Sequence, residues 1–369
     1  MKKVFRLTLA KTLVIAIVIV MLFSFIIGAV FTAQMSSQTT RNIHKPSYGV
    51  VGASSAAQAL MTSARAMATV EVTSGRLLYE KNAYQRLPMA STTKILTAIT
   101  VLENVTSIEE IVKVNNKAIG IEGTSIYLQR GEELSVKELL LGLMLRSGND
   151  ASVALALHVS PSIQEFSFLM NAVARKAGAK DSNFKNPHGL DEEDHYTTAY
   201  DLAMISAYAM RNPIFAEIAA TKDAKISGVD YPRVLQNKNR LLRSNKQIVG
   251  VKTGFTSKAG RCFVGAMNLG EMTVVNVVLN CGPMFPESEQ MMKKAGSDFY
   301  MHKILSKETV ITPTFPDRHD RIGMVSEDFY YPLRKGEADK IDISMSEHDV
   351  MVFFNNTLIK TMPYSDGGE

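Results

Sequence analysis

The sequence lacks the features that mark several large classes of protein. It contains no internal repeat, no low-complexity block and no basic stripe with interleaved aromatic residues. The net charge of +5 comes mostly from four basic residues that precede the first long apolar run, and without them the balance is +1. These absences argue against a repeat protein and against nucleic acid as a partner.

Cysteine is also scarce, because Cys262 and Cys281 are the only two in the chain. With 369 residues and 46% hydrophobic side chains, the chain can bury a sizeable core without a disulfide or a structural metal. We interpret the two cysteines as small buried side chains. A disulfide between them is the alternative, which an exported location would permit.

Acidic residues are absent from the first 33 residues, where an uncharged apolar run extends from Thr12 to Ala33. As a helix this run would span roughly 33 Å, which matches the apolar core of a bilayer. We therefore interpret residues 1–33 as an uncleaved membrane anchor with a cytoplasmic N-terminus; a cleaved signal peptide is the alternative. Either interpretation places the rest of the protein outside the cytoplasm, with residues 34–57 as a tether rich in Ser, Thr and Gln.

The remaining pattern predicts strands on either side of a helical middle. We expect a β-hairpin over residues 66–81 and further strands from about residue 248. The expected helices cover residues 88–103, 135–145, 151–159, 162–177 and 198–210. This order predicts an α+β domain with a mostly antiparallel sheet over residues 58–304. A small C-terminal β domain is predicted over residues 305–369, with a hairpin at Asn355-Asn356.

One apolar helix carries a lysine where a buried charge would be costly. Ser91 and Lys94 are three residues apart in "STTK", so a helix would place them on the same side. A buried ammonium group must be paired or lose its proton. Lys94 could simply pair with an acid, but desolvation could also lower its pKa until it accepts the proton of Ser91. A second S-x-x-K, Ser182 to Lys185, precedes Pro187 in a polar loop, and we discount it.

Two more motifs strengthen the catalytic interpretation. "SGN" at Ser147–Asn149 interrupts two apolar helices, where an ordinary helix-to-helix turn is the alternative. "KTG" at Lys252–Gly254 lies in an apolar strand, where Lys252 could be an edge-strand lysine that prevents aggregation. It could equally be an anion site with Thr253, beside a glycine that admits a substrate backbone. The ordered set of three motifs is specific, although each one alone is common.

The sequence resembles the serine D-alanyl-D-alanine carboxypeptidases, or low-molecular-mass penicillin-binding proteins, from about residue 70 to 304. The shared segments include "SGRLLYEKNA", "MASTTKILTA", "LLLGLMLRSGNDAS", "NPHGLDEEDHYTTAYDLA" and "VGVKTGFTSKAGRC". The resemblance implies a β-lactamase/transpeptidase-like fold and hydrolysis of the terminal D-Ala-D-Ala bond of peptidoglycan stem pentapeptides, with release of D-alanine. It implies no cofactor and no metal, and covalent binding of β-lactam antibiotics. The amphipathic C-terminal helix that usually tethers this family to the membrane is not found in this sequence.

The resemblance also implies a role for each motif residue. Ser91 is the nucleophile, Lys94 its base, and Ser147 the residue that passes a proton to the leaving amine. Substrate binding falls to Asn149, Lys252, Thr253 and Gly254. The backbone N–H groups of Ser91 and Phe255 form the oxyanion hole.

Three rival interpretations come from other classes. A serine β-lactamase needs a carboxylate that activates water, and the nearest match, Glu165 to Asn171, has the spacing of a helix. A non-catalytic binding module is the second: a penicillin sensor should carry a cytoplasmic signalling domain, for which the residues before the apolar run leave little room, and release of D-alanine would distinguish an enzyme from a scaffold. A metal site could form from His188, Asp191, Asp194 and His195, but we favour a solvated loop there.

Overall fold

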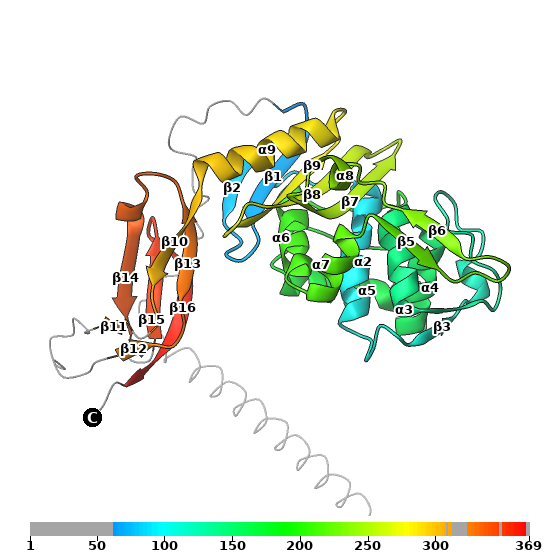
Figure 1. Cartoon of the computed structure of the whole chain (residues 1–369), viewed down its shortest axis with the longest axis horizontal. Coiled ribbons are helices and arrows are strands. Elements are labelled where there is room, and N and C mark those ends of the chain that lie inside the picture. The colour runs from blue at the N-terminus through cyan, green and yellow to red at the C-terminus, as the bar shows by residue number, and fades with distance from the viewer. Residues whose placement is uncertain (1–61, 308, 312–322, 347–348, 367–369) are drawn as a thin grey trace, which may run out of the picture. The chain divides into compact units, whose positions relative to one another are not determined.

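The computed structural model describes residues 62–307, 309–311, 323–346 and 349–366 (Figure 1). The expected anchor over residues 1–33 and the tether over residues 34–57 lie outside the described residues. Within the described ranges, the structure holds no helix with the length and apolarity required to cross a membrane.

A five-stranded antiparallel sheet forms the centre of the structure, with strand order β2-β1-β9-β8-β7. Its strands are β1 (Ala66–Glu71), β2 (Leu77–Lys81), β7 (Ile248–Thr256), β8 (Gly260–Asn268) and β9 (Thr273–Leu279). The first two come from the N-terminal hairpin, and the last three come from the end of the helical segment. This arrangement confirms the predicted α+β fold and leaves β7 at an edge of the sheet.

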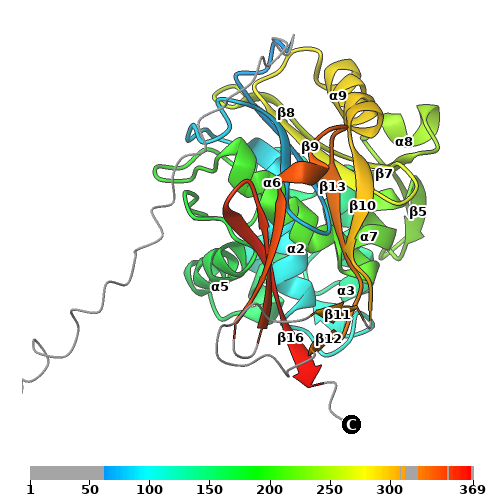
Figure 2. The ribbon, with the colours of Figure 1, turned by 90° about the vertical axis from the view of Figure 1, so that its left-hand side faces the viewer.

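Helices cover both faces of this sheet, as Figures 1 and 2 show. Helix α9 (Met284–Asp298) packs on one face, and α6 (Ala199–Met210) and α7 (Pro213–Ala220) pack on the other. The side chains of β8 alternate accordingly: Val264 faces the helical middle, and Phe263 faces α9. Both faces are therefore buried.

The two cysteines lie on opposite sides of the sheet. Cys262 on β8 packs with the core of the helical middle, whereas Cys281 packs with the residues beneath α9. Asn280 has a φ of 50°, and this turn after β9 directs Cys281 to the second side. Both thiols are free and buried, and the Sγ of Cys281 donates to Glu287. A disulfide would require one strand to reverse its faces.

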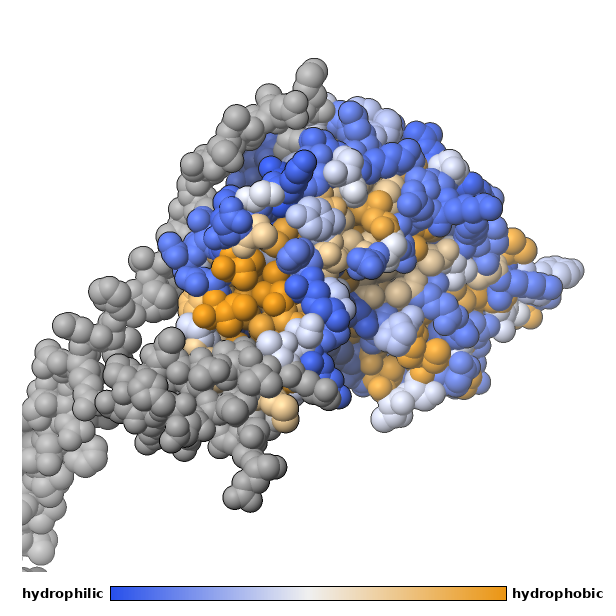
Figure 3. Space-filling view, turned by 60° about the vertical axis from the view of Figure 1, so that its left-hand side comes forward, coloured by the Kyte–Doolittle hydropathy of each residue, from blue (hydrophilic) through white to orange (hydrophobic). Residues whose placement is uncertain are grey.

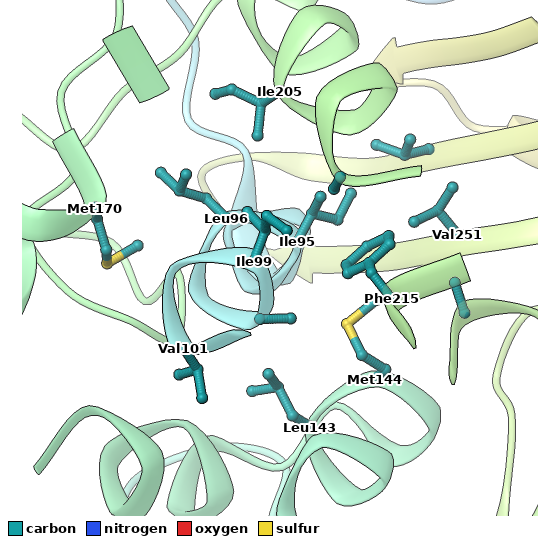
Figure 4. Packing of buried hydrophobic residues seen from close by; sticks show 14 of the residues in the cluster. Ile95, Leu96, Ile99, Val101, Leu143, Met144, Met170, Ile205, Phe215 and Val251 are labelled. Atoms are coloured by element: carbon teal, nitrogen blue, oxygen red, sulfur yellow. The ribbon is translucent and has the colours of Figure 1, made fainter. Parts of the chain in front are cut away.

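The helical middle is built around α2 (Lys94–Leu102), which packs against helices on several sides (Figure 4). The other helices are α3 (Val136–Leu141), α4 (Asn149–Val159) and α5 (Ile163–Lys176), with a π-helical turn at Gly142–Arg146. The predicted capping box is present, because Ser135 and Glu138 bond reciprocally at the start of α3. Ile95, Leu96 and Ile99 of α2 are fully buried.

Shorter elements connect these layers. They are the 3-10 turns η1 (Ala90–Thr93) and η2 (Asn116–Ala118), the strand pair β3 (Ile111–Lys113) and β4 (Glu133–Ser135), the hairpin β5 (Asp223–Ile226) and β6 (Arg233–Gln236), and α8 (Leu241–Ser244). Of these, η1 and the β5–β6 hairpin are the elements that matter for the site.

The C-terminal region forms two further antiparallel sheets. β10 (Tyr300–Leu305) pairs with β13 (Phe329–Leu333), and a five-stranded sheet has the order β11-β12-β16-β15-β14. Its strands are β11 (Val310–Ile311), β12 (Gly323–Val325), β14 (Ile341–Met345), β15 (Asp349–Phe354) and β16 (Thr357–Asp366), with a 3-10 turn at Ala338–Lys340. The predicted hairpin is present, and its turn residues Asn355 and Asn356 both have positive φ. The division of the chain into domains at residue 304 remains a prediction.

Exposed apolar side chains also occur on the C-terminal sheets. Ile343 on β14 and Leu358 on β16 are exposed. In the space-filling view, hydrophobic residues gather in one area that hydrophilic residues border (Figure 3).

Candidate active site

Ser91 and Lys94 meet at the start of the central helix. Ser91 lies in the 3-10 turn η1, and Lys94 is the first residue of α2. The Nζ of Lys94 lies 3.0 Å from the Oγ of Ser91, and the lysine side chain is fully buried. The helical spacing therefore produces the predicted contact, and the apolar helix removes the amine from water.

Two carbonyl oxygens complete the surroundings of this amine. The Nζ of Lys94 donates to Asn149 Oδ1 and to the backbone oxygen of His188, each at 2.6 Å. A neutral amine has two N–H donors and one lone pair. When both donors are used by these carbonyls, the lone pair faces the hydroxyl of Ser91. The geometry thus matches that of a base poised to accept the proton of Ser91.

Electrostatics favour the neutral amine. Burial lowers the pKa of Lys94 well below its usual value, and the positive charges of Lys252 and Lys238 lower it further. The carboxylate of Asp150 acts in the opposite direction but has a smaller effect. Among the described residues, the acceptors that contact Lys94 are uncharged, and none of them forms an ion pair that would favour the ammonium form.

The S-x-N turn places its serine and asparagine between the π-helical turn and α4. Ser147 is buried and has a left-handed backbone with a φ of 66°. Among the described residues its hydroxyl has no hydrogen-bond partner, which leaves it available to a ligand. Asn149 is the first residue of α4; its Nδ2 donates to the oxygen of Glu122 at 2.5 Å while its Oδ1 accepts from Lys94.

The K-T-G segment lies on the edge strand β7, directly against the turn that carries Ser91. A Cβ on Gly254 would lie 3.0 Å from the backbone nitrogen of Ser91 and 3.1 Å from the oxygen of Met89. A larger residue would therefore have to displace the backbone of the turn by a few tenths of an ångström, whereas glycine lets the strand approach the nucleophile this closely. Phe255, the next residue, is exposed.

Lys252 is buried, unlike the solvated edge lysine that was the alternative. Its side chain is 1% exposed, and its Nζ donates to the oxygen of Thr253 at 3.0 Å. Burial lowers its pKa to about 7, and the charge of Lys238 adds to this effect. A cation held this way has no acid partner among the described residues, so it is suited to bind an anionic ligand.

Sequence reasoning missed Lys238, which is the third cation of the cleft. It follows β6, and its Nζ lies 3.3 Å from Thr124 Oγ1. Its charge lowers the pKa of both Lys94 and Lys252. The sequence signal that could have indicated this lysine is "NKN", in which Asn237 and Asn239 flank Lys238. Asn237 Oδ1 accepts from the backbone N–H of Asn239, and Asn239 Nδ2 donates to the oxygen of Gly250, so the two asparagines fix this turn.

A second feature that sequence reasoning missed is the structural role of the loop of residues 185–195, which packs against the turn that carries Ser91. Gly189 has a φ of 85°, and a Cβ there would lie 2.0 Å from the oxygen of Ala90. Thr97 Oγ1 donates to the oxygen of Pro187, and the ring of His195 lies 3.1 Å from Thr93 Oγ1. The loop also supplies the His188 carbonyl that binds Lys94.

This loop contains the residues considered as a metal site. Burial lowers the pKa of His188 to about 3 and that of His195 to about 4. Within the described ranges, no group of three or more His, Cys, Asp or Glu side chains is arranged to hold a metal ion. The expectation of a solvated loop is wrong at its ends, where Asn186 and His195 are buried; Asp191 and Asp194 are exposed.

The segment that was compared with the β-lactamase motif lies within a helix. Glu165 to Asn171 lies on α5, as its spacing predicted, and Glu165 is exposed. Its carboxylate accepts from Ser162 at the start of the same helix.

Residues 53–282 match the family described as D-alanyl-D-alanine carboxypeptidase. The chain is 32% identical to the D-alanyl-D-alanine carboxypeptidase DacF of Bacillus subtilis, over 78% of this chain and 72% of that protein.

Two solved structures are similar as well. Penicillin-binding protein 5 from Haemophilus influenzae superposes with a TM-score of 0.71 at 24% identity, over 84% of this chain and 98% of the other, which shows the shared fold. A mutant of the Streptomyces K15 DD-transpeptidase is 30% identical with a TM-score of 0.60, over 64% of this chain and 98% of the other.

Proposed function

This chain belongs to the D-alanyl-D-alanine carboxypeptidase family, and from that premise we propose that it hydrolyses the terminal D-Ala-D-Ala bond of peptidoglycan stem pentapeptides through an acyl-enzyme on Ser91. The enzyme acts on peptidoglycan and so works outside the cytoplasm, where residues 1–33 would anchor it to the membrane. No metal or cofactor enters the proposed reaction.

The first step is attack by Ser91. Its Oγ adds to the carbonyl carbon of the penultimate D-alanine while Lys94 Nζ accepts the hydroxyl proton. The carbonyl π electrons move onto oxygen, and the backbone N–H groups of Ser91 and Phe255 bind the resulting oxyanion. In other acyl-transfer enzymes one such donor contributes about 3–4 kcal/mol.

Collapse of this intermediate expels the last D-alanine. The C–N bond breaks, and its nitrogen receives a proton that Ser147 passes on from Lys94. Lys252 and Thr253 hold the carboxylate of the leaving residue, and Asn149 orients the peptide. Water then attacks the ester with Lys94 again as the base, which releases the shortened stem and restores Ser91.

One observation carries this proposal: the buried Nζ of Lys94 lies 3.0 Å from the Oγ of Ser91 and donates to two carbonyl oxygens, so that a neutral amine there would turn its lone pair toward Ser91. That arrangement explains why the lysine is tolerated inside an apolar helix. It also explains why no histidine is needed beside the serine.

A β-lactam would enter the same cleft as a mimic of the acyl-D-Ala-D-Ala group. Its carbonyl would acylate Ser91, and we expect the ester to persist because Glu165, the nearest match to a water-activating carboxylate, is exposed on α5 and accepts from Ser162 of its own helix. We expect slow release, and fast steady-state hydrolysis of penicillin would assign the chain to the β-lactamases instead.

Two measurements test the proposal. Purified protein is incubated with a stem pentapeptide, and free D-alanine is assayed. In parallel, protein treated with penicillin is digested with trypsin, and we expect the adduct on the peptide Leu87–Lys94. Absence of D-alanine release together with an unmodified Ser91 would overturn the proposal.

A further inference from the structure

Tyr127 has an unusual combination of backbone and side-chain features. Its φ is 61°, a left-handed conformation that a bulky residue rarely adopts. Its side chain is nevertheless 81% exposed, so no packing contact compensates for the conformation. Strain of this kind is usually found where it serves a function.

The surrounding hydrogen bonds impose this conformation. The backbone N–H groups of Ile126 and Leu128, on either side of Tyr127, both donate to the buried carboxylate of Asp150. The N–H of Tyr127 itself donates to Ser125 Oγ, and Arg233 donates to its oxygen. The backbone is thus fixed on both sides while the ring is directed into solvent.

A second tyrosine is presented by the adjacent hairpin. Tyr231 lies in the connection between β5 and β6 and is 82% exposed. The guanidinium of Arg233 binds the oxygen of Ser227 in this connection as well as that of Tyr127. Its ion pair with Glu132, at 2.6 Å, is largely buried. One rigid group therefore links both tyrosine-bearing loops.

The loop that carries Tyr127 contacts residues of the candidate active site. The oxygen of Thr124, three residues before Tyr127, accepts from the backbone N–H of Asn149, and its hydroxyl contacts Lys238. Three residues span at most about 10 Å. Figure 1 shows the β5–β6 hairpin beside α3 and α4, and β5 contacts α3.

We propose that Tyr127 and Tyr231 form a binding surface for the sugar rings of the glycan strand that carries the stem peptide. This inference rests on the proposed function. Four stem residues lie between the sugar and the carbonyl that Ser91 attacks, and they span at most about 14 Å, so a substrate bound at Ser91 keeps its sugars close to the site. A tyrosine ring offers an apolar face and a hydroxyl, which match the C–H face and the hydroxyls of a pyranose.

The test compares two substrates with the same stem. For Tyr127→Gly and Tyr231→Ala we expect kcat/KM for D-alanine release from glycan strands to fall about three- to tenfold, with no change on the free pentapeptide. Tyr127→Phe keeps the apolar ring face and loses only the hydroxyl, so it should lose less activity on strands than Tyr127→Gly. Tyr300→Ala, which removes an exposed tyrosine of β10, is the matched control.

Stability separates binding from fold damage. Glycine adopts a positive φ at little cost, so Tyr127→Gly should melt at the same temperature as the wild type or higher. Equal losses on both substrates, or no loss on strands, would overturn the inference. So would tyrosine-dependent binding to lipid vesicles without an effect on strands.

A binding assay distinguishes this inference from the proposed function. Strands stripped of stem peptides should bind the wild-type protein more tightly than the Tyr127→Gly/Tyr231→Ala protein. If the wild type releases no D-alanine but shows this difference, the proposed function fails and the sugar surface stands. If D-alanine is released and strand binding is unchanged by the substitutions, only the sugar surface fails.

Discussion

The chain contains two S-x-x-K segments, and they differ in everything except spacing. Lys94 is fully buried and contacts Ser91, whereas Lys185 is exposed. Ser182 binds Asp201 Oδ2 and Thr197 Oγ1, each at 2.7 Å, and its segment lies outside any helix. The first serine thus faces an amine, and the second is committed to a structural bond.

The difference teaches that the motif acquires chemistry from its surroundings. A helical turn brings the side chains together, burial makes the lysine a base, and two carbonyls orient its lone pair. None of these conditions holds at Ser182–Lys185. Matched substitutions in the two segments therefore separate the effect of the S-x-x-K motif from the effect of its structural environment.

The largest contrast is expected for the serines. Ser91→Ala should lower kcat for D-alanine release by about 10⁴-fold or more, because the nucleophile is removed. Ser182→Ala should leave kcat unchanged and cost about 1 kcal/mol of the free energy of unfolding, because it loses bonds to Thr197 and Asp201. Turnover assays and denaturant titrations measure both, and a large kcat loss in Ser182→Ala would contradict the comparison.

The lysines should give the next largest contrast. Lys94→Met keeps the length and apolar packing of the side chain but removes the base, so acylation by penicillin should slow by about 10²–10⁴-fold. Lys185→Met changes an exposed side chain and should acylate at the wild-type rate. Stopped-flow measurement with a fluorescent penicillin gives both rates, and equal rates in Lys94→Met and the wild type would remove Lys94 from the mechanism.

A smaller effect is expected from the strand that lies against Ser91, for which the second segment has no counterpart. Gly254→Ala places a Cβ 3.0 Å from the nitrogen of Ser91 and should lower kcat/KM by about 10²-fold through displacement of the turn. At Gly282 a Cβ would meet nothing within 4 Å, so Gly282→Ala is the control. Equal activity of the two variants would show that β7 adapts without cost.

Much of this site could be predicted from the sequence because its parts are local. The Ser91–Lys94 contact follows from helix periodicity, and the Ser135 capping box and the Asn355-Asn356 turn follow from short-range rules. Lys238 and the His188 carbonyl could not be predicted in the same way. Lys238 is brought to the cleft by long-range packing, and a backbone carbonyl leaves no signature in the residue type.

The cysteines show the same limit. Burial was predictable from their residue type, but their placement on opposite faces depends on the turn at Asn280, which reverses the alternation after β9. A turn that was one residue longer or shorter would have placed Cys281 on the other face of the sheet.

The smallest contrast concerns the pH dependence of stability. A buried lysine with a lowered pKa should make the free energy of unfolding rise with pH, and an exposed lysine should not. The pKa of Lys252 is about 7 in the folded protein and has its ordinary value of 10.5 when unfolded. Between these values the unfolded chain binds more protons, so the free energy of unfolding rises with pH, by at most about 1.4 kcal/mol per unit for this group.

Lys252→Met removes this contribution, whereas Lys185→Met does not. Between pH 7 and 9 the free energy of unfolding of the wild type should therefore increase relative to that of Lys252→Met, and Lys185→Met should remain parallel to the wild type. Well below pH 7 the wild type and Lys252→Met should differ by a constant, because Lys252 is then protonated in both the folded and the unfolded state. Urea titrations at each pH measure these differences. If all three curves stay parallel from pH 7 to 9, Lys252 keeps its charge in the fold, and burial alone does not distinguish the lysines of the cleft from that of the second segment.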